Sequence, residues 1–161
     1  MLLGAAFLNR LRGNFNQSRA YASDAFETAR ESGDNEGRAQ ALYQIGLVRL
    51  DDSDFAAAES LFNEGLGLIQ GSGDKQVMAL LLNGLGESAR SREDFTLAAE
   101  LYRKALGYNR QAGDRVRQTT NLINLGVTAL SQNDFDKAAE FYKEGLEISS
   151  GMADMNGSIY C

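Results

Sequence analysis

The amino-acid sequence predicts an all-α fold, an α-solenoid in which antiparallel helix pairs stack along one axis. Four phenylalanines recur at intervals of 40 residues, each directly after an asparagine or aspartate: Phe15, Phe55, Phe95 and Phe135. Apolar residues within each interval are spaced i, i+3, i+4 and i+7, which is typical of amphipathic helices. The chain also contains no proline, the residue that breaks helix interiors. A repeated pair of helices accounts for all three observations.

Further positions share this interval and set the limits of the repeats within a single domain. We expect units over residues 1–33, 34–73, 74–113 and 114–153, each closed by a Gly-Asp or Ala-Asp pair. Residues 154–161 are expected to begin a further helix. The recurring positions include a leucine column (Leu2, Leu42, Leu82 and Leu122) and a small-residue column (Ser18, Ala58, Ala98 and Ala138).

Each unit is expected to contain two helices, named here helix A and helix B. In the second unit, helix A is predicted from about Asp34 to Leu50 and helix B from about Asp54 to Gln70. Asp54 stands where an acidic N-cap favours helix initiation. Gly71-Ser72-Gly73 should end helix B, because glycine is favoured just past a helix C-terminus.

A glycine column lies inside helix A, although an interior glycine costs about 1 kcal/mol relative to alanine. Gly46, Gly86 and Gly126 repeat there, with Ala6 at the equivalent position of the first unit. We expect these glycines to allow close approach of helix A to small residues of helix B. The column therefore predicts packing rather than chemistry.

Composition disfavours several classes of function. The formal net charge is −6, and no basic stripe is present of the kind that neutralises nucleic-acid phosphates. The chain has no histidine, the commonest metal ligand and general base. Its single cysteine, Cys161, cannot form an internal disulfide, and the apolar run Met1–Leu8 is too short to span a bilayer. We therefore expect a cytoplasmic protein without a membrane or nucleic-acid partner.

The repeat resembles the tetratricopeptide repeat, whose pattern joins a bulky residue, Leu-Gly, Gly-Asp-Tyr/Phe, alanine, an aromatic residue and a second alanine. The usual unit has about 34 residues and often ends in proline, whereas this unit has 40 and no proline. HEAT repeats approach this length but lack the combination. The third unit carries the pattern as Leu82, Leu85-Gly86, Glu93-Asp94-Phe95, Ala98, Tyr102 and Ala105.

The resemblance implies a right-handed superhelix that binds a partner and carries no cofactor. The long repeat is similar to the C-terminal arrays of bacterial signal-transduction ATPases and transcriptional regulators, to animal G-protein-signalling modulators and to bacterial peptide-pheromone receptors. In these families the superhelix recognises a protein, a peptide or a small inducer. The chain itself has no phosphate-binding Gly-x-x-x-x-Gly-Lys loop.

In tetratricopeptide superhelices helix A lines the concave face, which makes its variable positions the candidate partner-binding residues. The apolar columns suit a peptide with alternating apolar anchors, whereas a clamp for a C-terminal carboxylate would need more Lys and Asn. The alternative is that tight curvature buries these columns between neighbouring units. The candidates are Phe7, Arg10, Tyr43, Leu47, Asn83, Glu87, Arg90, Ile123 and Val127, with Leu3, Leu11, Gln40, Leu50, Asp51, Leu80, Thr120 and Leu130 in the same columns.

No catalytic or metal-binding constellation is predicted. Glu87 and Arg90 have the spacing of a solvated helix pair, and Asp51, Asp52 and Asp54 are better explained as helix-terminal acids than as a calcium loop. We therefore expect a non-enzymatic interaction scaffold within a regulatory protein. The alternative is a sensor that binds a small inducer or signalling peptide in the concave groove.

The sequence begins and ends inside a helix A of the repeat. Met1 aligns with the middle of helix A, and residues 154–161 align with the start of another helix A. We expect a fragment of a longer array, or copies that stack end to end with residues 154–161 covering the half-helix that the first unit lacks.

Overall fold

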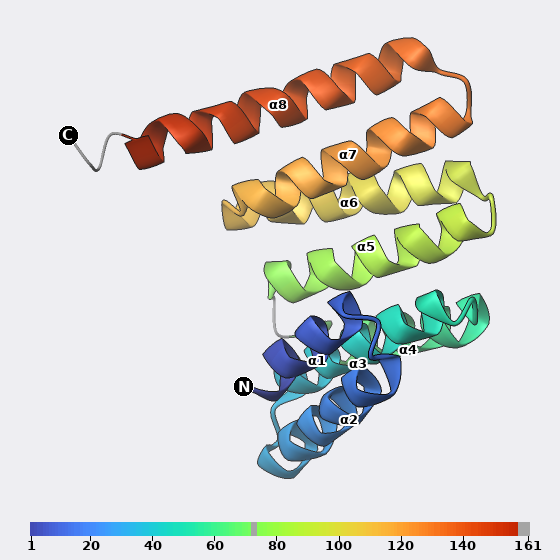
Figure 1. Cartoon of the computed structure of the whole chain (residues 1–161), viewed down its shortest axis with the longest axis vertical. Helices are drawn as coiled ribbons and strands as arrows, with labels where there is room; N and C mark the ends of the chain where they lie inside the picture. The colour runs from blue at the N-terminus through green and yellow to red at the C-terminus, as the bar shows by residue number, and fades with distance from the viewer. Residues whose placement is uncertain (72–73, 158–161) are drawn as a thin grey trace.

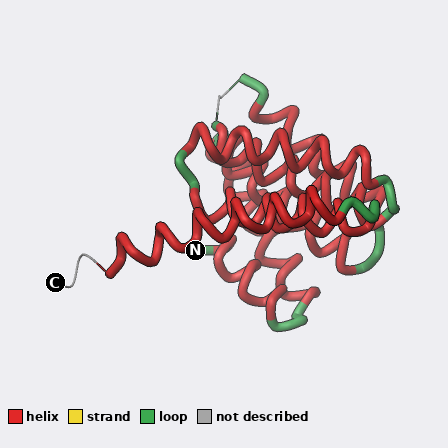
Figure 2. Tube along the Cα trace, turned by 90° about the horizontal axis from the view of Figure 1, so that it is seen from above, coloured by secondary structure: helices red, strands yellow, loops and turns green. Residues whose placement is uncertain are grey.

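The computed structural model describes residues 1–71 and 74–157, with side chains up to residue 151. These residues form helices and turns, and the described part of the chain contains no strand. Helices A and B alternate along the chain (Figures 1 and 2). Their bounds are α1 Leu2–Leu11, α2 Phe15–Ser32, α3 Asn35–Asp51, α4 Phe55–Ile69, α5 Lys75–Ser91, α6 Phe95–Ala112, α7 Arg115–Ser131 and α8 Phe135–Gly157.

The helices pair and stack as a superhelical solenoid, which confirms the predicted fold class. Each helix packs mainly against its neighbours in the sequence, and α1 and α5 both also pack against α3. In Figure 1 the stack runs from α2 at one end to α8 at the other, and Figure 2 looks down on it from the α8 end. The helices of the second unit lie within about one residue of their predicted ends.

Aspartates at the helix starts cap the helices, as the sequence predicted. The Asp54 carboxylate accepts a hydrogen bond from the Ala57 N–H at 3.2 Å, and Asp74 accepts from Gln76 and Val77 at 2.8 and 2.9 Å. Asp34, Asp94 and Asp114 cap their helices in the same way. These contacts satisfy N–H groups that the first turn of a helix leaves without intrahelical partners.

The turns between helices have a residue with left-handed backbone just before the capping position. Gly33 and Gly113, between a helix B and the next helix A, have φ of 71° and 70°. At the turn between helix A and helix B, Ser53, Glu93 and Asn133 have φ of 60°, 63° and 58°. The left-handed region is unfavourable for residues with a Cβ, so these turns are determined by the helices around them.

The glycine column makes room for aromatic rings of helix B, not for the small residues that we expected opposite it. A Cβ added to Gly86 would lie 2.6 Å from Cε1 of Tyr102, and one added to Gly126 would lie 2.5 Å from Cε1 of Tyr142. Gly46 faces Phe62 in the same way. Phe62 and Tyr102 are completely buried. Each ring therefore occupies the volume that the glycine leaves free.

Helix α8 departs from the predicted unit boundary. The sequence placed the start of a further helix at Asp154, but α8 continues through Gly157 without a break. Ala153 stands in the column of Gly33 and Gly113, which adopt positive φ where their helices end. An alanine enters that conformation only at a cost of about 1–2 kcal/mol, so the helical conformation persists.

The glycine–aromatic contact predicts the effect of a single methyl group. Gly86→Ala should lower the free energy of unfolding by about 1–3 kcal/mol, because overpacking against Tyr102 exceeds the gain of about 1 kcal/mol in helix propensity. Gly67→Ala is the matched control, since no atom lies within 4 Å of its added Cβ. Urea denaturation should show Gly67→Ala as neutral or stabilising, and equal stability of both variants would contradict the packing role.

The caps predict a dependence of stability on pH. Hydrogen bonds from the Val77 N–H above all hold the pKa of Asp74 below its ordinary value. A lowered pKa in the folded state gives stability that is present above the unfolded pKa of about 4 and is lost as pH falls through the folded value. Asp74→Ala should therefore destabilise the protein by about 1 kcal/mol at pH 7, and by less at pH 3. Thermal melts of both proteins at the two pH values measure this difference.

Candidate partner-binding site

The first helices of the four pairs meet at a polar cavity. Its volume is about 180 Å³, and residues from α1, α3, α5 and α7 line it. Three glutamines and an arginine supply hydrogen-bonding groups, while leucine and valine side chains supply apolar surface. The lining consists of Leu3, Gln40, Tyr43, Gln44, Gln76, Val77, Leu80 and Arg117.

Gln44 brings an unsatisfied acceptor to this cavity. Its Oε1 atom is buried and has no hydrogen-bond partner among the described residues. A buried amide oxygen without a donor costs about 1–3 kcal/mol relative to a satisfied one. The cavity is thus suited to a group that donates a hydrogen bond.

The charge at the cavity comes from Arg117 and is partly neutralised. Its guanidinium forms an ion pair with Asp114, the N-cap residue of the same helix. Burial acts to raise the pKa of Asp114, but hydrogen bonds from the Arg117 N–H and guanidinium outweigh it and hold that pKa below its ordinary value. The arginine side chain remains 43% exposed, so it can still contact a bound group.

The structure brings the polar groove candidates into contact with one another. Arg10 on α1 donates to Asp51 on α3, with Nε and Oδ2 2.6 Å apart. Glu87 accepts from Arg90 of its own helix and, at 3.3 Å, from the hydroxyl of Tyr102. Much of the hydrogen-bonding capacity of these side chains is therefore used within the chain.

The apolar groove candidates divide into buried and accessible residues. Leu47 was a predicted contact residue, but only 9% of it is exposed, because it packs into the core with Phe62. Tyr43 lies against the same ring, with centroids 5.9 Å apart, and burial raises the pKa of its hydroxyl. Phe7 and Ile123 are 44% and 47% exposed, and Val127 is half-buried.

An asparagine network at α5, α6 and α7 was not predicted. Asn109 donates to Asn121 at 2.6 Å, and Asn121 and Asn124 both donate to Oδ1 of Asn83, at 2.9 and 3.0 Å. Asn109 and Asn121 are almost completely buried, and Oδ1 of Asn109 has no hydrogen-bond partner within the described part of the chain. The sequence does contain a sign of this network. Asn109 and Asn121 are polar residues at positions where the preceding unit has the apolar Ile69 and Leu81.

Sequence reasoning also missed four residues of the cavity itself: Gln44, Gln76, Val77 and Arg117. They lie outside the groove columns carried over from the tetratricopeptide pattern. The sequence feature that could have pointed to them is the number of glutamines in the helix A segments. The prediction from the tetratricopeptide pattern did not consider it.

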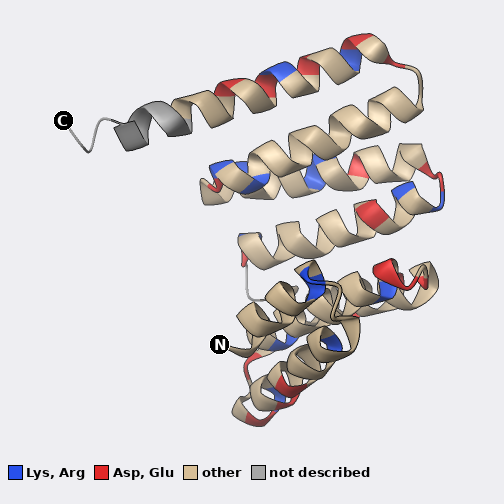
Figure 3. Cartoon of the chain, in the orientation of Figure 1, with Lys and Arg blue, Asp and Glu red and all other residues tan. Residues whose placement is uncertain are grey.

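The remaining charged groups are dispersed. In Figure 3, acidic and basic residues alternate over several helices rather than gathering into a stripe of one sign. Arg92 and Glu59 form a surface ion pair at 2.8 Å, of a kind that contributes up to about 1 kcal/mol. Within the described residues, no group of three or more acidic or cysteine side chains is placed to hold a metal ion.

A helix that crosses a membrane must be long and apolar. The described helices were compared by these two properties alone: length and apolar character. None of them combines the length and the apolar character needed to cross a bilayer.

The chain is similar in fold to solved structures of helical-repeat proteins. BtubC (BKLC) from P. vanneervenii matches with a TM-score of 0.76 and 22% identity, over 94% of this chain and 63% of that protein. The apo form of RapI matches with a TM-score of 0.80 and 16% identity, over 98% of this chain and 57% of that one. Aspartyl phosphate phosphatase F from Bacillus subtilis matches with a TM-score of 0.84 and 18% identity, over 95% and 40%.

This chain thus spans between 40% and 63% of the length of these proteins. No curated protein matches the sequence. The sequence profile of the tetratricopeptide repeat matches residues 1–70 and 77–150. The fold is that of a scaffold for protein–protein interaction, and the chain belongs to the tetratricopeptide repeat family.

Proposed function

We propose that the concave cavity binds an extended peptide segment of a partner protein. The observation that carries this proposal is the buried Oε1 of Gln44, which finds no partner among the residues that the structure describes, in a cavity that three glutamines help to line. An extended peptide presents N–H and C=O groups in alternation, and glutamine amides can both accept from and donate to them. A main-chain N–H of the ligand would satisfy Gln44.

The groups around Gln44 define the chemistry of the segment. Arg117 favours a carboxylate at one end of the cavity, supplied by an acidic side chain or a chain terminus. Leu3, Val77 and Leu80 favour a small apolar side chain beside it. Along the same face, the exposed Phe7 and Ile123 offer further apolar contact.

We propose that four polar residues line the groove without being the main contacts to the peptide: Arg10, Asn83, Glu87 and Arg90. Their side chains hydrogen-bond within the protein, so a ligand would have to replace those contacts. Tyr43 and Val127 have a smaller free surface, and Leu47 contributes by packing. The proposed anchors are therefore Gln44 and Arg117.

The proposed setting is a cytoplasmic regulatory protein in which this chain is the non-enzymatic interaction part. Support comes from the repeat itself, which resembles the arrays of bacterial signalling and transcriptional regulators. The aspartyl phosphate phosphatase that shares the fold is, by its name, an enzyme acting on a phosphorylated aspartate. A connection of this chain to signal transduction is part of the proposal.

A sensor for a small inducer is the second candidate, and the polar lining of the cavity favours it. The volume of about 180 Å³ lies below the 300–1,000 Å³ that is typical of small-molecule sites. The peptide is placed first because it needs to place only part of its length in the cavity, whereas a small inducer would have to be held there entirely. Thermal-shift screening separates the two, because a specific small molecule would raise the melting temperature without any peptide.

The test is selection of binders from a displayed library of random peptides, followed by measurement of Kd for the purified chain. Gln44→Leu should weaken a selected peptide about tenfold, since one hydrogen bond is worth roughly 1.4 kcal/mol. Arg117→Ala should weaken peptides that carry a carboxylate and leave neutral ones unchanged. Gln111→Leu, on the exposed side of α6, is the matched control.

Two outcomes would contradict the proposal. One is a library that yields no peptide with measurable affinity. The other is a set of peptides whose Kd is the same for the unmodified chain and for Gln44→Leu.

A further inference from the structure

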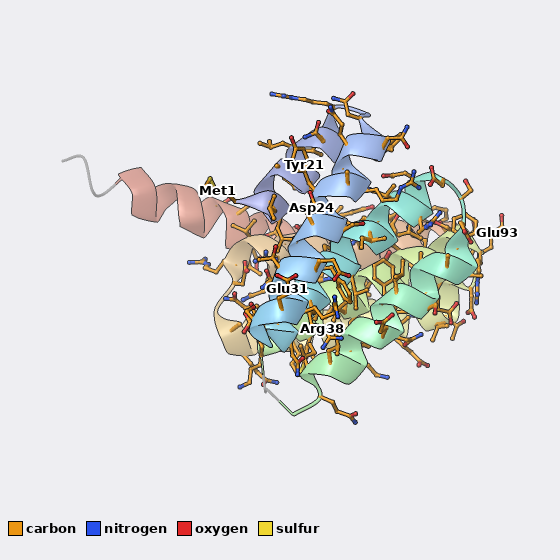
Figure 4. The ribbon with its side chains drawn as sticks, turned by 90° about the horizontal axis from the view of Figure 1, so that it is seen from below. Met1, Tyr21, Asp24, Glu31, Arg38 and Glu93 are labelled. Atoms are coloured by element: carbon orange, nitrogen blue, oxygen red, sulfur yellow. The ribbon has the colours of Figure 1, made fainter. Side chains whose placement is uncertain are left out.

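The asparagine network reaches the wall of the cavity through Tyr43. The side chain of Asn83 on α5 hydrogen-bonds the hydroxyl of Tyr43 on α3. On its other side, Oδ1 of Asn83 accepts from Asn121 and Asn124 of α7, at 2.9 and 3.0 Å. Helices α3, α5 and α7 follow one another along the stack, which Figure 4 views from the end formed by α1 and α2. The network thus connects a residue of the cavity to the two following units.

The hydrogen bonds of Asn83 determine which of its two amide atoms is left for Tyr43. An amide oxygen has two lone pairs, and the two N–H groups from α7 occupy both of them. The Nδ2 amino group remains, and it can only donate. The Tyr43 hydroxyl is therefore the acceptor in its hydrogen bond with Asn83.

A hydroxyl oxygen that accepts a hydrogen bond keeps its own proton for another partner. The Tyr43 ring packs against Phe62, with centroids 5.9 Å apart, which restricts where this hydroxyl can lie. Tyr43 lines the cavity and Asn83 does not. The proton that Asn83 leaves free is therefore available to a group bound in the cavity.

Tyr43 and Gln44 are consecutive residues of the cavity wall and offer opposite hydrogen-bonding groups. Tyr43 has a proton to donate, while the buried Oε1 of Gln44 lacks a donor among the described residues. In an extended chain the N–H and C=O of one residue point to the same side, which is how paired residues of antiparallel strands exchange two hydrogen bonds. A donor next to an acceptor thus matches the main chain of one extended residue.

We propose that Tyr43 and Gln44 together bind the main chain of a single peptide residue, with Gln44 accepting from its N–H and Tyr43 donating to its C=O. This inference rests on the proposed function, because it requires a peptide in the cavity. Recognition at this point does not depend on the side chain of the bound residue. Asn83 is a positioning residue, since it acts through the Tyr43 hydroxyl.

The first test replaces the amides of a selected peptide by esters, one bond at a time. The ester that removes the bound N–H leaves Gln44 without its donor. The ester on the next bond weakens the carbonyl that accepts from Tyr43. Each should raise the Kd of the unmodified chain about tenfold, the value of one hydrogen bond. The first effect should disappear in Gln44→Leu and the second in Tyr43→Phe, as in a double-mutant cycle.

The second test reverses the hydrogen bond between Tyr43 and Asn83. Asn83→Asp keeps the shape of the side chain and the oxygen that accepts from α7, but it replaces the amino group by a second oxygen. Tyr43 would then donate its proton to the new carboxylate and have none for the peptide. A neutral peptide should bind about tenfold more weakly, as it should to Tyr43→Phe. The combined variant should bind no more weakly than either single one.

Asn63→Asp is the matched control for this charge, because Asn63 is exposed on α4. It should leave the Kd within twofold of the value for the unmodified chain. Thermal melts of all variants verify that the fold is retained, which separates loss of the positioned hydroxyl from loss of structure.

The outcomes distinguish this proposal from the proposed function. Peptides that lose affinity in Gln44→Leu but bind Tyr43→Phe and Asn83→Asp as well as the unmodified chain would overturn the proposal and leave the proposed function standing. Ester effects that are the same in every variant would also overturn it. A library without any binding peptide would contradict both.

Discussion

The contact between a glycine of helix A and an aromatic ring of helix B determines the geometry of this solenoid. Glycine removes the side chain at the crossing point, and the Phe62 or Tyr102 ring then packs against the bare backbone of the partner helix. The first unit solves the same volume problem differently, because Ala6 stands in the glycine column and Ala22 stands in the aromatic column. Both alanines are completely buried. The first unit therefore fills this crossing with less side-chain volume than the other units.

This division leaves the concave face free to vary. The packing columns hold the helix pairs together, and the groove columns differ from unit to unit, as Tyr43, Asn83 and Ile123 illustrate. Where the variable residues are polar, they form contacts between helices, such as the hydrogen bonds from Asn121 and Asn124 to Asn83. Residues outside these columns also line the cavity, among them Gln44, whose Oε1 has no donor among the described residues. The proposed binding residues therefore lie where the repeat is least regular.

The fold could be predicted from the sequence because the features that determine it repeat along the chain and act over short distances. The phenylalanine interval gives the unit length, and the aspartate caps act within one unit. Together they located the helices of the second unit to about one residue. The aromatic partner of the glycine column was missed, because spacing alone does not show which residues of two helices face each other. The cavity was missed for a related reason: Arg117 and Gln44 meet only through the stacking of several helices. The continuation of α8 past residue 153 was also missed. It depends on a single residue, Ala153, which stands where other units have a glycine that ends the helix.

The alanine pair of the first unit has a consequence for how the molecule loses its structure. In a solenoid, stability is a sum of terms for single units and for contacts between neighbours, so the parts need not unfold together. Helix α1 meets α2 through Ala6 and Ala22 instead of a glycine and an aromatic ring. We expect the amide protons of α1 and α2 to exchange with solvent before those of α3 to α6. Because Leu3 lines the cavity, each such opening would also expose the proposed site.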